Sequence, residues 1–316
     1  MNPYPDPFPS PQTTIGRRAL RALGAGVRQH VHPGGRRAQA ARRVGEKLGF
    51  HVVPRHFYSP IPDLEEIPED IFDRRTGMAG IEMAGERQLQ LIESLRSYVA
   101  EFPHHGPPNY DVENGGYESV EAELLYAIIR HHKPRRVLEV GTGYSTLVTA
   151  AAAKMNAEAG SPLRLISVDP NPYQNTSEVC DGGIGLEQRP IPVQDVPMEE
   201  FRALEAGDIF FVDGTHVVRL GGDVNFVVLE VLPQLQPGVF VHFHDIYLPY
   251  EYPRYFVERF FWTEQYLLQA FLACNPSFGV VLAAHYLAQC HAARLASVFP
   301  SFNPKRTPSA FWLQRR

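Results

Sequence analysis

The chain has few cysteines and no long apolar runs, and each shortage excludes a class of protein. Its 316 residues include three cysteines, Cys180, Cys274 and Cys290, which are too few and too scattered for a disulfide framework or a zinc knuckle. We therefore expect reduced thiols in a cytoplasmic protein. No segment approaches the roughly 18 uncharged apolar residues of a membrane span, and the N-terminus lacks the apolar core of a signal peptide. An integral membrane segment is not expected.

The charge is distributed unevenly along the chain. The formal net charge is −5, yet residues 1–50 hold nine Arg or Lys against two acids, a net of +7, so the remainder carries −12. Because the larger part is acidic and has no basic groove, we expect no nucleic-acid partner. The basic segment 14–49 either docks on a membrane surface or a partner subunit, or is a weakly packed, solvated extension. We favour the extension.

The sequence divides into three parts by composition. Residues 1–49 form an arm that is proline-rich and then basic, residues 50–117 a pre-domain that caps the site, and residues 118–316 the catalytic domain. Apolar periodicity predicts helices at 83–101 and 118–132. Further helices are predicted at 145–157, 221–235 and 254–273. Strands are predicted at 135–141, 163–169, 186–192, 208–213, 238–245, 278–286 and 309–315.

This alternation of strands and helices predicts an α/β fold. Short apolar strands separated by helices form a parallel sheet covered on both faces. The last two strands are joined by a connection of about 20 residues without the crossover helix that links parallel strands. This predicts an antiparallel hairpin at one edge of the sheet. The expected architecture is therefore a doubly wound, mostly parallel seven-stranded sheet with a C-terminal antiparallel hairpin and a helical N-terminal extension.

The segment RRVLEVGTGYSTLVTA, residues 135–150, reads as a strand that enters a helix through a nucleotide-binding loop. In such sheets ligands bind at the carboxyl ends of the strands. A dinucleotide loop has the pattern G-x-G-x-x-G. Here the third glycine is missing, and Glu139 stands two residues before Gly141, where it would repel a phosphate. The loop therefore favours a cationic ligand over a dinucleotide. Binding of NAD, and with it an NAD-dependent oxidoreductase, remains the alternative.

The acidic-x-Gly-x-Gly loop resembles the first motif of the class I S-adenosylmethionine (SAM)-dependent methyltransferases, which have a Rossmann-like fold. Within them the chain is similar to the small-molecule O-methyltransferases that include macrocin-type sugar methyltransferases. The resemblance covers residues 105–316, and residues 56–104, with HFYSPIPD, look like the pre-domain of bacterial members. Ser145 departs from the usual third glycine, but serine can cap the helix that follows.

The resemblance implies SAM as the cofactor and assigns residues to it. These are Glu139, Gly141, Thr142, Gly143, Ser145, Asp169 and Asp195. Glu139 would hold the ammonium group, and the two glycines would let the methionine part approach closely. Asp169 would bind the ribose hydroxyls, unless it only forms a turn at a strand end. Asp195 would reach the adenine amino group, unless it is an ordinary helix cap.

Polar residues gather where the fourth and fifth predicted strands end. One strand ends in Asp213-Gly-Thr-His216 and the next in His242-Phe-His244-Asp245. Because neighbouring parallel strands end at the same edge, we expect Asp213, His216, His244 and Asp245 to converge, with His242 deeper. Convergent titratable groups in a cleft usually mark a site. Alternatively, the acids cap helices and the histidines satisfy buried backbone groups.

Two catalytic roles compete for this cluster. A histidine could act as general base on an acceptor hydroxyl, with His244 the first choice and His216 the second, and Asp213 beside them. Alternatively, a divalent metal such as Mg, Fe or Mn would be held by Asp213, His244 or Asp245, and His285. Related sugar and catechol methyltransferases bind Mg²⁺ at these strand ends, but imidazole favours Fe, Mn, Zn or Ni.

Aromatic loops above the strand ends are candidates for binding the acceptor. Tyr110, Tyr117, Tyr247 and Tyr250 could stack on a planar or sugar-like molecule and hydrogen-bond it. Alternatively, these rings pack the pre-domain onto the sheet.

The sequence as a whole predicts an O-methyltransferase for a small-molecule acceptor, in keeping with bacterial specialised metabolism. The alternatives are metal-dependent C- or N-methylation, non-methyl SAM chemistry, an oxidoreductase, and a binding protein without turnover. The oligomeric state is open, with a homodimer as one option.

Overall fold

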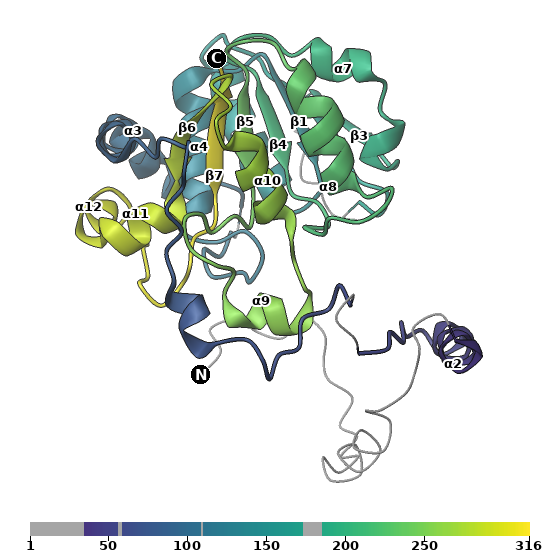
Figure 1. The fold of residues 1–316 in the computed structure, drawn as a ribbon. Coiled ribbons are helices and arrows are strands. Elements are labelled where there is room, and N and C mark those ends of the chain that lie inside the picture. Colours follow the sequence, from purple (N-terminus) through teal and green to yellow (C-terminus); the bar gives the residue numbers. More distant parts are fainter. Residues whose placement is uncertain (1–34, 56–58, 109, 173–184) are drawn as a thin grey trace. The chain divides into compact units, whose positions relative to one another are not determined.

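Short apolar segments after residue 135 form the strands of one sheet (Figure 1). The computed structural model describes residues 35–55, 59–108, 110–172 and 185–316. The strands are β1 (Arg136–Val140), β2 (Arg164–Val168), β3 (Gly185–Arg189), β4 (Ile209–Val212), β5 (Phe240–Phe243), β6 (Phe278–Ala283) and β7 (Phe311–Arg315). Their order is β3-β2-β1-β4-β5-β7-β6. The pairs from β3 to β5 are parallel, and β7 is antiparallel to β5 and β6. The predicted sheet and its C-terminal hairpin are confirmed.

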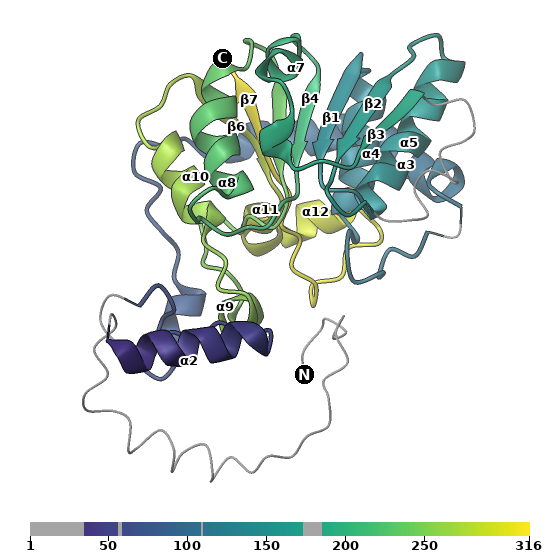
Figure 2. The ribbon, with the colours of Figure 1, turned by 90° about the vertical axis from the view of Figure 1, so that its right-hand side faces the viewer.

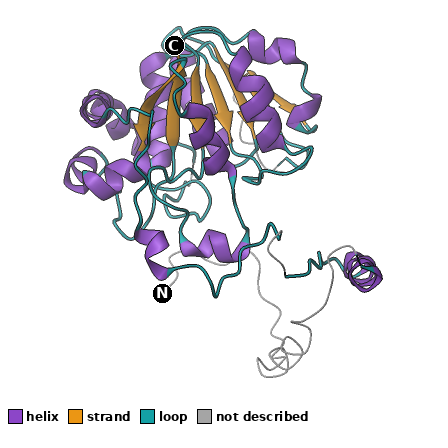
Figure 3. Cartoon of the chain, in the orientation of Figure 1, coloured by secondary structure: helices purple, strands orange, loops and turns teal. Residues whose placement is uncertain are grey.

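Helices cover both faces of the sheet because successive strand residues point to opposite sides. Val137 and Phe211 pack with α3 (Gly85–His105), α4 (Glu121–His132) and α5 (Tyr144–Glu158). Leu138 and Phe210 face the other side, which α7 (Met198–Arg202), α8 (Asp223–Phe226) and α10 (Glu264–Leu272) cover. Figure 2 shows these two helical layers, and Figure 3 separates helices and strands by colour. The sheet is therefore a buried central layer.

The remaining elements are short. They are α2 (Arg36–Lys47), η1 (Glu69–Asp73), η2 (Val193–Asp195), η3 (Val227–Val231), η4 (Leu232–Gln234), α9 (Arg254–Arg259), α11 (Ala284–Cys290) and α12 (Ala292–Val298). Segments α8, η3 and η4 together form the helical segment predicted at 221–235. Cys274 and Cys290 are free thiols, and Cys180 lies outside the described residues. Within the described part of the chain, every helix is too short or too polar to cross a bilayer.

Two predicted segments differ in the structure. The helix expected at 254–273 is broken between α9 and α10, where the backbone NH groups of Thr263 and Glu264 donate to the carbonyl of His216 (2.8 and 3.0 Å). This contact with the loop after β4 fixes a new helix start, which periodicity along the chain cannot reveal. The strand expected at 278–286 ends at Ala283, so His285 lies in α11 and not in a strand.

The chain divides into two compact units. One contains the described residues from Phe72 onward, and the other those up to Ile71. In the smaller unit, Gly45 of α2 lies so close to Val52 that an added Cβ would be 2.6 Å from its Cγ2 atom. Residues 1–34, which include the proline-rich start of the arm, lie outside the described residues. The three-part division of the sequence stays a prediction, but α3, from the predicted pre-domain, packs within the larger unit.

Candidate active site

Glu139 ties the end of β1 to the beginning of α5. Its carboxylate is 1% exposed and accepts hydrogen bonds from the hydroxyl groups of Ser145 (2.6 Å) and Thr146 (2.7 Å). Both hydroxyl groups belong to the first turn of α5. Burial raises the pKa of Glu139 to about 8 in spite of these bonds. The carboxyl group is therefore mostly protonated at neutral pH in the absence of a cationic partner.

Gly141 brings this loop into direct contact with the end of β4. Its φ is +93°, and a Cβ at this position would lie 2.3 Å from the carbonyl oxygen of Asp213. Only glycine allows this approach. Gly143 has an extended φ of −172°, and a Cβ there would meet nothing within 4 Å. The loop thus packs against Asp213 at one glycine and borders open space at the other.

Asp169 lies beside the same loop, directly after β2. One carboxylate oxygen accepts the backbone NH of Thr142 (3.0 Å), and the other accepts the NH of Asn171 (2.7 Å). The hydroxyl of Thr142 also lies 2.7 Å from that of Ser167 in β2. The structure therefore brings Asp169 to the loop after β1. Asp195 is exposed at the end of η2, and its role stays a prediction.

Four side chains converge where β4 and β5 end, as the sequence predicted. The Nε2 atom of His216 lies 3.3 Å from Oδ1 of Asp213 and 3.5 Å from Oδ2 of Asp245. The Nδ1 atom of His244 lies 3.5 Å from the same two oxygen atoms. We call these four residues the strand-end cluster. Carboxylate and imidazole atoms alternate around it.

Two further carboxylates face the cluster from outside, and the sequence analysis missed both. Glu264 Oε2 lies 2.8 Å from Nδ1 of His216, and Glu121 Oε2 lies 3.2 Å from Nε2 of His244. Ser309 donates its backbone NH and its hydroxyl to Glu121, and its hydroxyl also lies 3.0 Å from Asp245. Both glutamates begin helices, where an acid is ordinary, so their sequence context gave no signal.

Backbone conformation also marks the cluster. His216 and Asp245 have φ values of +57° and +56°, a left-handed region that non-glycine residues rarely adopt. Such conformations gather at functional sites because the surrounding contacts must hold them. Here the carbonyl of His216 accepts the backbone NH groups of Thr263 and Glu264 at the start of α10, and Asp245 accepts the hydroxyl group of Tyr247. These contacts fix where both side chains point.

Neighbouring charges shift the pKa values of the residues in the strand-end cluster. Burial alone would lower the pKa of His216, but Asp213 and Glu264 outweigh it and raise that pKa to about 10. Burial is likewise outweighed at His244, where Asp245 and Asp213 raise the pKa well above its usual value. At Asp213, burial opposes the two imidazoles, which hold the pKa well below its usual range. The acids that surround the two imidazoles therefore favour the protonated form of both histidines.

The other two histidines lie apart from this arrangement. His242 is fully buried and stacks on Phe211 at 4.2 Å between ring centroids, which confirms its deeper position. His285, expected among the metal ligands, sits in α11 against the rings of Tyr247 and Tyr250. The described contacts do not join His285 to the strand-end cluster, and burial lowers its pKa to about 4.

The four predicted acceptor-binding tyrosines lie in different environments. Tyr117 and Tyr247 are 3% and 1% exposed and belong to the packed interior. Tyr117 covers His244 at 5.1 Å between ring centroids, and its hydroxyl has no hydrogen-bond partner among the described residues. Tyr110 donates to the carbonyl of Tyr117. Tyr250 is partly exposed, and its hydroxyl lies 3.6 Å from the Cys290 sulfur. Their roles towards an acceptor stay predictions.

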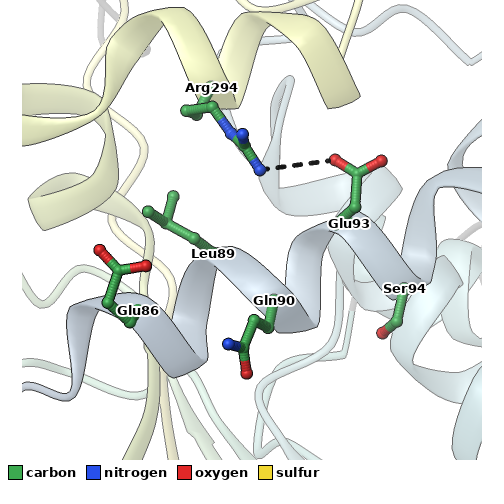
Figure 4. Close-up of a pocket in the computed structure, with 6 residues that line it drawn as sticks. All are labelled: Glu86, Leu89, Gln90, Glu93, Ser94 and Arg294. Atoms are coloured by element: carbon green, nitrogen blue, oxygen red, sulfur yellow. Dashed lines mark ion pairs between the residues drawn. The ribbon is translucent and has the colours of Figure 1, made fainter.

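A surface pocket of about 630 Å³ lies elsewhere, between α3 and α12 (Figure 4). Glu86, Leu89, Gln90, Glu93, Ser94 and Arg294 line it. Arg294 and Glu93 face each other across it at 3.9 Å. None of its lining residues belongs to the β1 loop or to the strand-end cluster, so the chemistry of the site does not depend on it.

Comparison with known proteins gives one family model and one curated relative. A family model described as a methyltransferase domain matches residues 138–246, a range that contains the β1 loop and the whole strand-end cluster. A protein of Archaeoglobus fulgidus, whose name states no function, is 32% identical over 173 residues. The match covers 51% of this chain and 77% of that protein, so the two chains belong to one family.

Solved structures resemble the chain more weakly. One is a methyltransferase of Podospora anserina with S-adenosylhomocysteine (SAH) bound, at 14% identity and a TM-score of 0.38, covering 73% of this chain and 88% of that one. Another is an O-methyltransferase of Bacillus cereus in complex with SAH, at 13% identity and a TM-score of 0.36, covering 72% and 90%. At scores this low, the likeness supports no conclusion about activity.

Proposed function

We propose that this chain is a SAM-dependent methyltransferase that transfers the methyl group to an oxygen atom of a small-molecule acceptor. The observation that carries the proposal is the contact of the β1 loop with the strand-end cluster. Gly141 of the loop packs on the backbone of Asp213, which is itself a member of the cluster. A methyl donor bound at the loop would therefore lie next to groups that can hold an acceptor oxygen and its proton.

The loop residues fit SAM, which supplies the methyl group on a sulfonium and carries no phosphate. A buried carboxyl with a raised pKa, Glu139, is suited to an ammonium group that compensates its charge. The open space at Gly143 leaves room for the methionine part. Asp169 would accept the ribose hydroxyls. We assign the site to Glu139, Gly141, Thr142, Gly143, Ser145 and Asp169, with Asp195 towards the adenine.

The strand-end cluster suits an oxygen acceptor. Methyl transfer is an in-line displacement that needs a lone pair about 3 Å from the methyl carbon, and a hydroxyl oxygen must lose its proton to provide one. The side chain of Asp213 is 33% exposed, whereas those of His216 and His244 are each 7% exposed. An acceptor would therefore approach from the side of Asp213.

The raised pKa values of both histidines favour one of the two predicted roles. The surrounding acids favour the protonated imidazole at both positions, and a protonated imidazole cannot accept a further proton as a general base. A cation bound among Asp213, His244 and their neighbours would replace those protons and lower the pKa of a bound hydroxyl. We therefore favour a metal-assisted reaction over a histidine base.

The acceptor class follows from the resemblance and from the loops near the site. A hydroxylated, planar or sugar-like molecule, as in macrocin-type methyltransferases, would suit the partly exposed ring of Tyr250. A cytoplasmic role in bacterial specialised metabolism is part of the same proposal.

The proposal is tested by titrating SAM and, separately, NAD(H) into the purified chain, followed by turnover with hydroxylated acceptors and methyl-deuterated SAM. We expect micromolar SAM binding, no response to NAD(H), and SAH released together with a deuteromethyl ether. As a matched pair, Asp213→Asn should retain SAM binding but lose transfer, and His105→Gln, at the exposed end of α3, should retain both. A product methylated at nitrogen or carbon, or binding of NAD(H) alone, would contradict the proposal.

A further inference from the structure

Five large apolar side chains are exposed together in the smaller unit. Val44, Leu48 and Phe50 are 58%, 67% and 67% exposed, and Val52 and Val53 are 41% and 36% exposed. Single exposed apolar residues are ordinary on a protein surface, but a group of them marks an interaction site. We call these five residues the α2 apolar patch.

The turn that follows α2 brings the members of this patch close to one another. The backbone NH groups of Leu48 and Phe50 donate to the carbonyl of Gly45 (2.9 and 2.8 Å), so the chain folds back on the end of the helix. Gly45 has no side chain, and a Cβ there would lie 2.6 Å from Cγ2 of Val52. The apolar residues before and after the turn therefore share one surface.

Basic residues border the α2 apolar patch. Because an α-helix has 3.6 residues per turn, Arg36, Arg43 and Lys47 fall on one side of α2, and Val44 and Leu48 on the adjoining side. All five residues are exposed, and α2 is drawn in dark purple in Figure 2. Cations and apolar side chains thus lie in neighbouring rows along the helix.

The positive charge of this segment is not neutralised locally. The 12 residues of α2 include five cations and one acid, and within the described residues none of the five cations forms an ion pair. In the sequence, residues 14–34 add four arginines and no acid. Clusters of four to eight cations on an amphipathic helix are typical of binding to anionic lipids.

We infer that α2 and its apolar patch dock the protein on an anionic lipid bilayer, with the helix lying in the plane of the interface. At 12 residues, α2 is about 18 Å long, too short to span a hydrocarbon core of about 30 Å. Its apolar side chains would enter the boundary between headgroups and acyl chains, while the cations contact the anionic headgroups. This inference concerns the location of the protein and does not depend on the proposed function.

A bilayer fits this surface better than a second copy of the chain or a nucleic acid. The acidic remainder of another copy would complement the charge, but the patch also needs an apolar counterpart. In the described larger unit, the exposed large apolar side chains are Val218, Leu220, Leu229 and Tyr266, from three separate segments. A nucleic acid would bind the cations and leave the aliphatic residues exposed. A bilayer instead offers anionic and apolar layers side by side, so the structure favours docking over the solvated extension expected from sequence.

The first experiment floats the wild-type chain with vesicles in a density gradient, which separates bound protein from aggregates. One set of vesicles is phosphatidylcholine with about 30% phosphatidylserine, and the other is phosphatidylcholine alone. We expect at least about 10-fold stronger binding to the anionic vesicles, and at least about 10-fold weaker binding when NaCl rises from about 0.05 to about 0.5 M, because salt screens the cations. Equal binding to both sets, or no flotation at low salt, would overturn the inference.

Charge variants then locate the basic contact. Arg43→Gln combined with Lys47→Gln should weaken binding to anionic vesicles about 20-fold or more, since each cation near the surface contributes about 5-fold. Lys154→Gln combined with Arg294→Gln removes two exposed cations of the larger unit and should leave binding unchanged. An equal loss in the two double variants would refute the assignment to α2.

Apolar variants test insertion. Leu48→Ser combined with Phe50→Ser should weaken vesicle binding at least about 10-fold, because the apolar area that enters the bilayer is lost. The matched control, Leu220→Ser with Leu229→Ser, removes exposed apolar side chains of the larger unit and should bind as wild type does. Unchanged binding in the Leu48 and Phe50 variant would contradict insertion of the patch.

Size-exclusion chromatography of the same proteins separates the bilayer from a second copy as the partner. All four double variants change exposed positions, so each should retain the wild-type melting temperature. If one does not fold, the lipid and salt dependence of the wild-type chain decides the matter. A dimer that the Leu48 and Phe50 variant loses, without flotation of the wild type, would assign the patch to a second copy and refute membrane docking.

Discussion

Replacing Glu139 with glutamine should abolish a proton release that accompanies SAM binding. In the structure, Glu139 is buried and its pKa is raised to about 8. At pH 7 a group with that pKa is about 90% protonated, and at pH 9 about 10%. If the ammonium group of SAM pairs with the carboxylate, its pKa falls and the proton leaves. Binding at pH 7 should therefore release about 0.9 of a proton from Glu139.

The proton count is measured by titrating SAM calorimetrically in buffers of different ionisation enthalpy at pH 7 and pH 9. The amino group of SAM, with a pKa near 7.8, takes up at most about 0.1 of a proton at pH 7, which is small beside the release from the carboxyl group. The difference in proton release between wild type and Glu139→Gln should therefore be about 0.8 to 0.9 at pH 7. At pH 9 the carboxyl group releases only about 0.1 of a proton and the amino group takes up most of one, so binding to wild type should consume protons. An equal proton count in the two proteins at pH 7 would refute the assignment of Glu139 to the ammonium.

The same pKa has a consequence for stability without SAM. Because the folded chain binds this proton more tightly than the unfolded chain, whose glutamates titrate near 4.3, the stabilisation is fully present below that pH. It is lost as the pH rises through about 8. Urea unfolding at pH 6 and pH 9 should show a smaller decrease in stability for Glu139→Gln than for wild type.

Three further substitutions test the site. Gly141→Ala should destabilise the fold by about 2 kcal/mol or more, because the new Cβ would clash with the Asp213 carbonyl and the backbone φ is positive. Gly143→Ala is the matched control: its new Cβ would enter open space, so the melting temperature should change little. Asp169→Asn should weaken SAM binding roughly 10- to 100-fold in calorimetry by losing a charged acceptor. Tyr117→Phe removes a buried hydroxyl without a partner and should raise stability by about 1 kcal/mol, but raise the KM for the acceptor if that hydroxyl binds it.

Each of these substitutions has an outcome that contradicts its reasoning. Equal melting temperatures for the two glycine variants would show that the loop relaxes away from β4. Unchanged SAM affinity in Asp169→Asn would remove the ribose assignment. An unchanged KM in Tyr117→Phe would leave that ring with a packing role only.

Local sequence determined the sheet and the β1 loop. Strand-length segments predicted from the sequence lie within a few residues of every strand. The inner strands are apolar because a strand buried on both faces needs a continuous apolar run, whereas β3, at the edge of the sheet, is only partly buried. Glu139, Gly141 and Gly143 lie within five residues, so one short pattern was enough to indicate the loop. The convergence of the β4 and β5 ends also followed from sequence, since parallel neighbours end at one edge.

Tertiary structure alone decided what surrounds the strand-end cluster. Glu264 is 48 residues from His216, and Glu121 is 123 residues from His244, so no local pattern connects them. The break before α10 and the placement of His285 in α11 likewise depend on contacts between distant segments. The periodicity of apolar residues along the sequence predicts only which face of a helix or strand is buried. The positions of Glu264 and Glu121 beside the two imidazoles therefore arise from packing between distant segments.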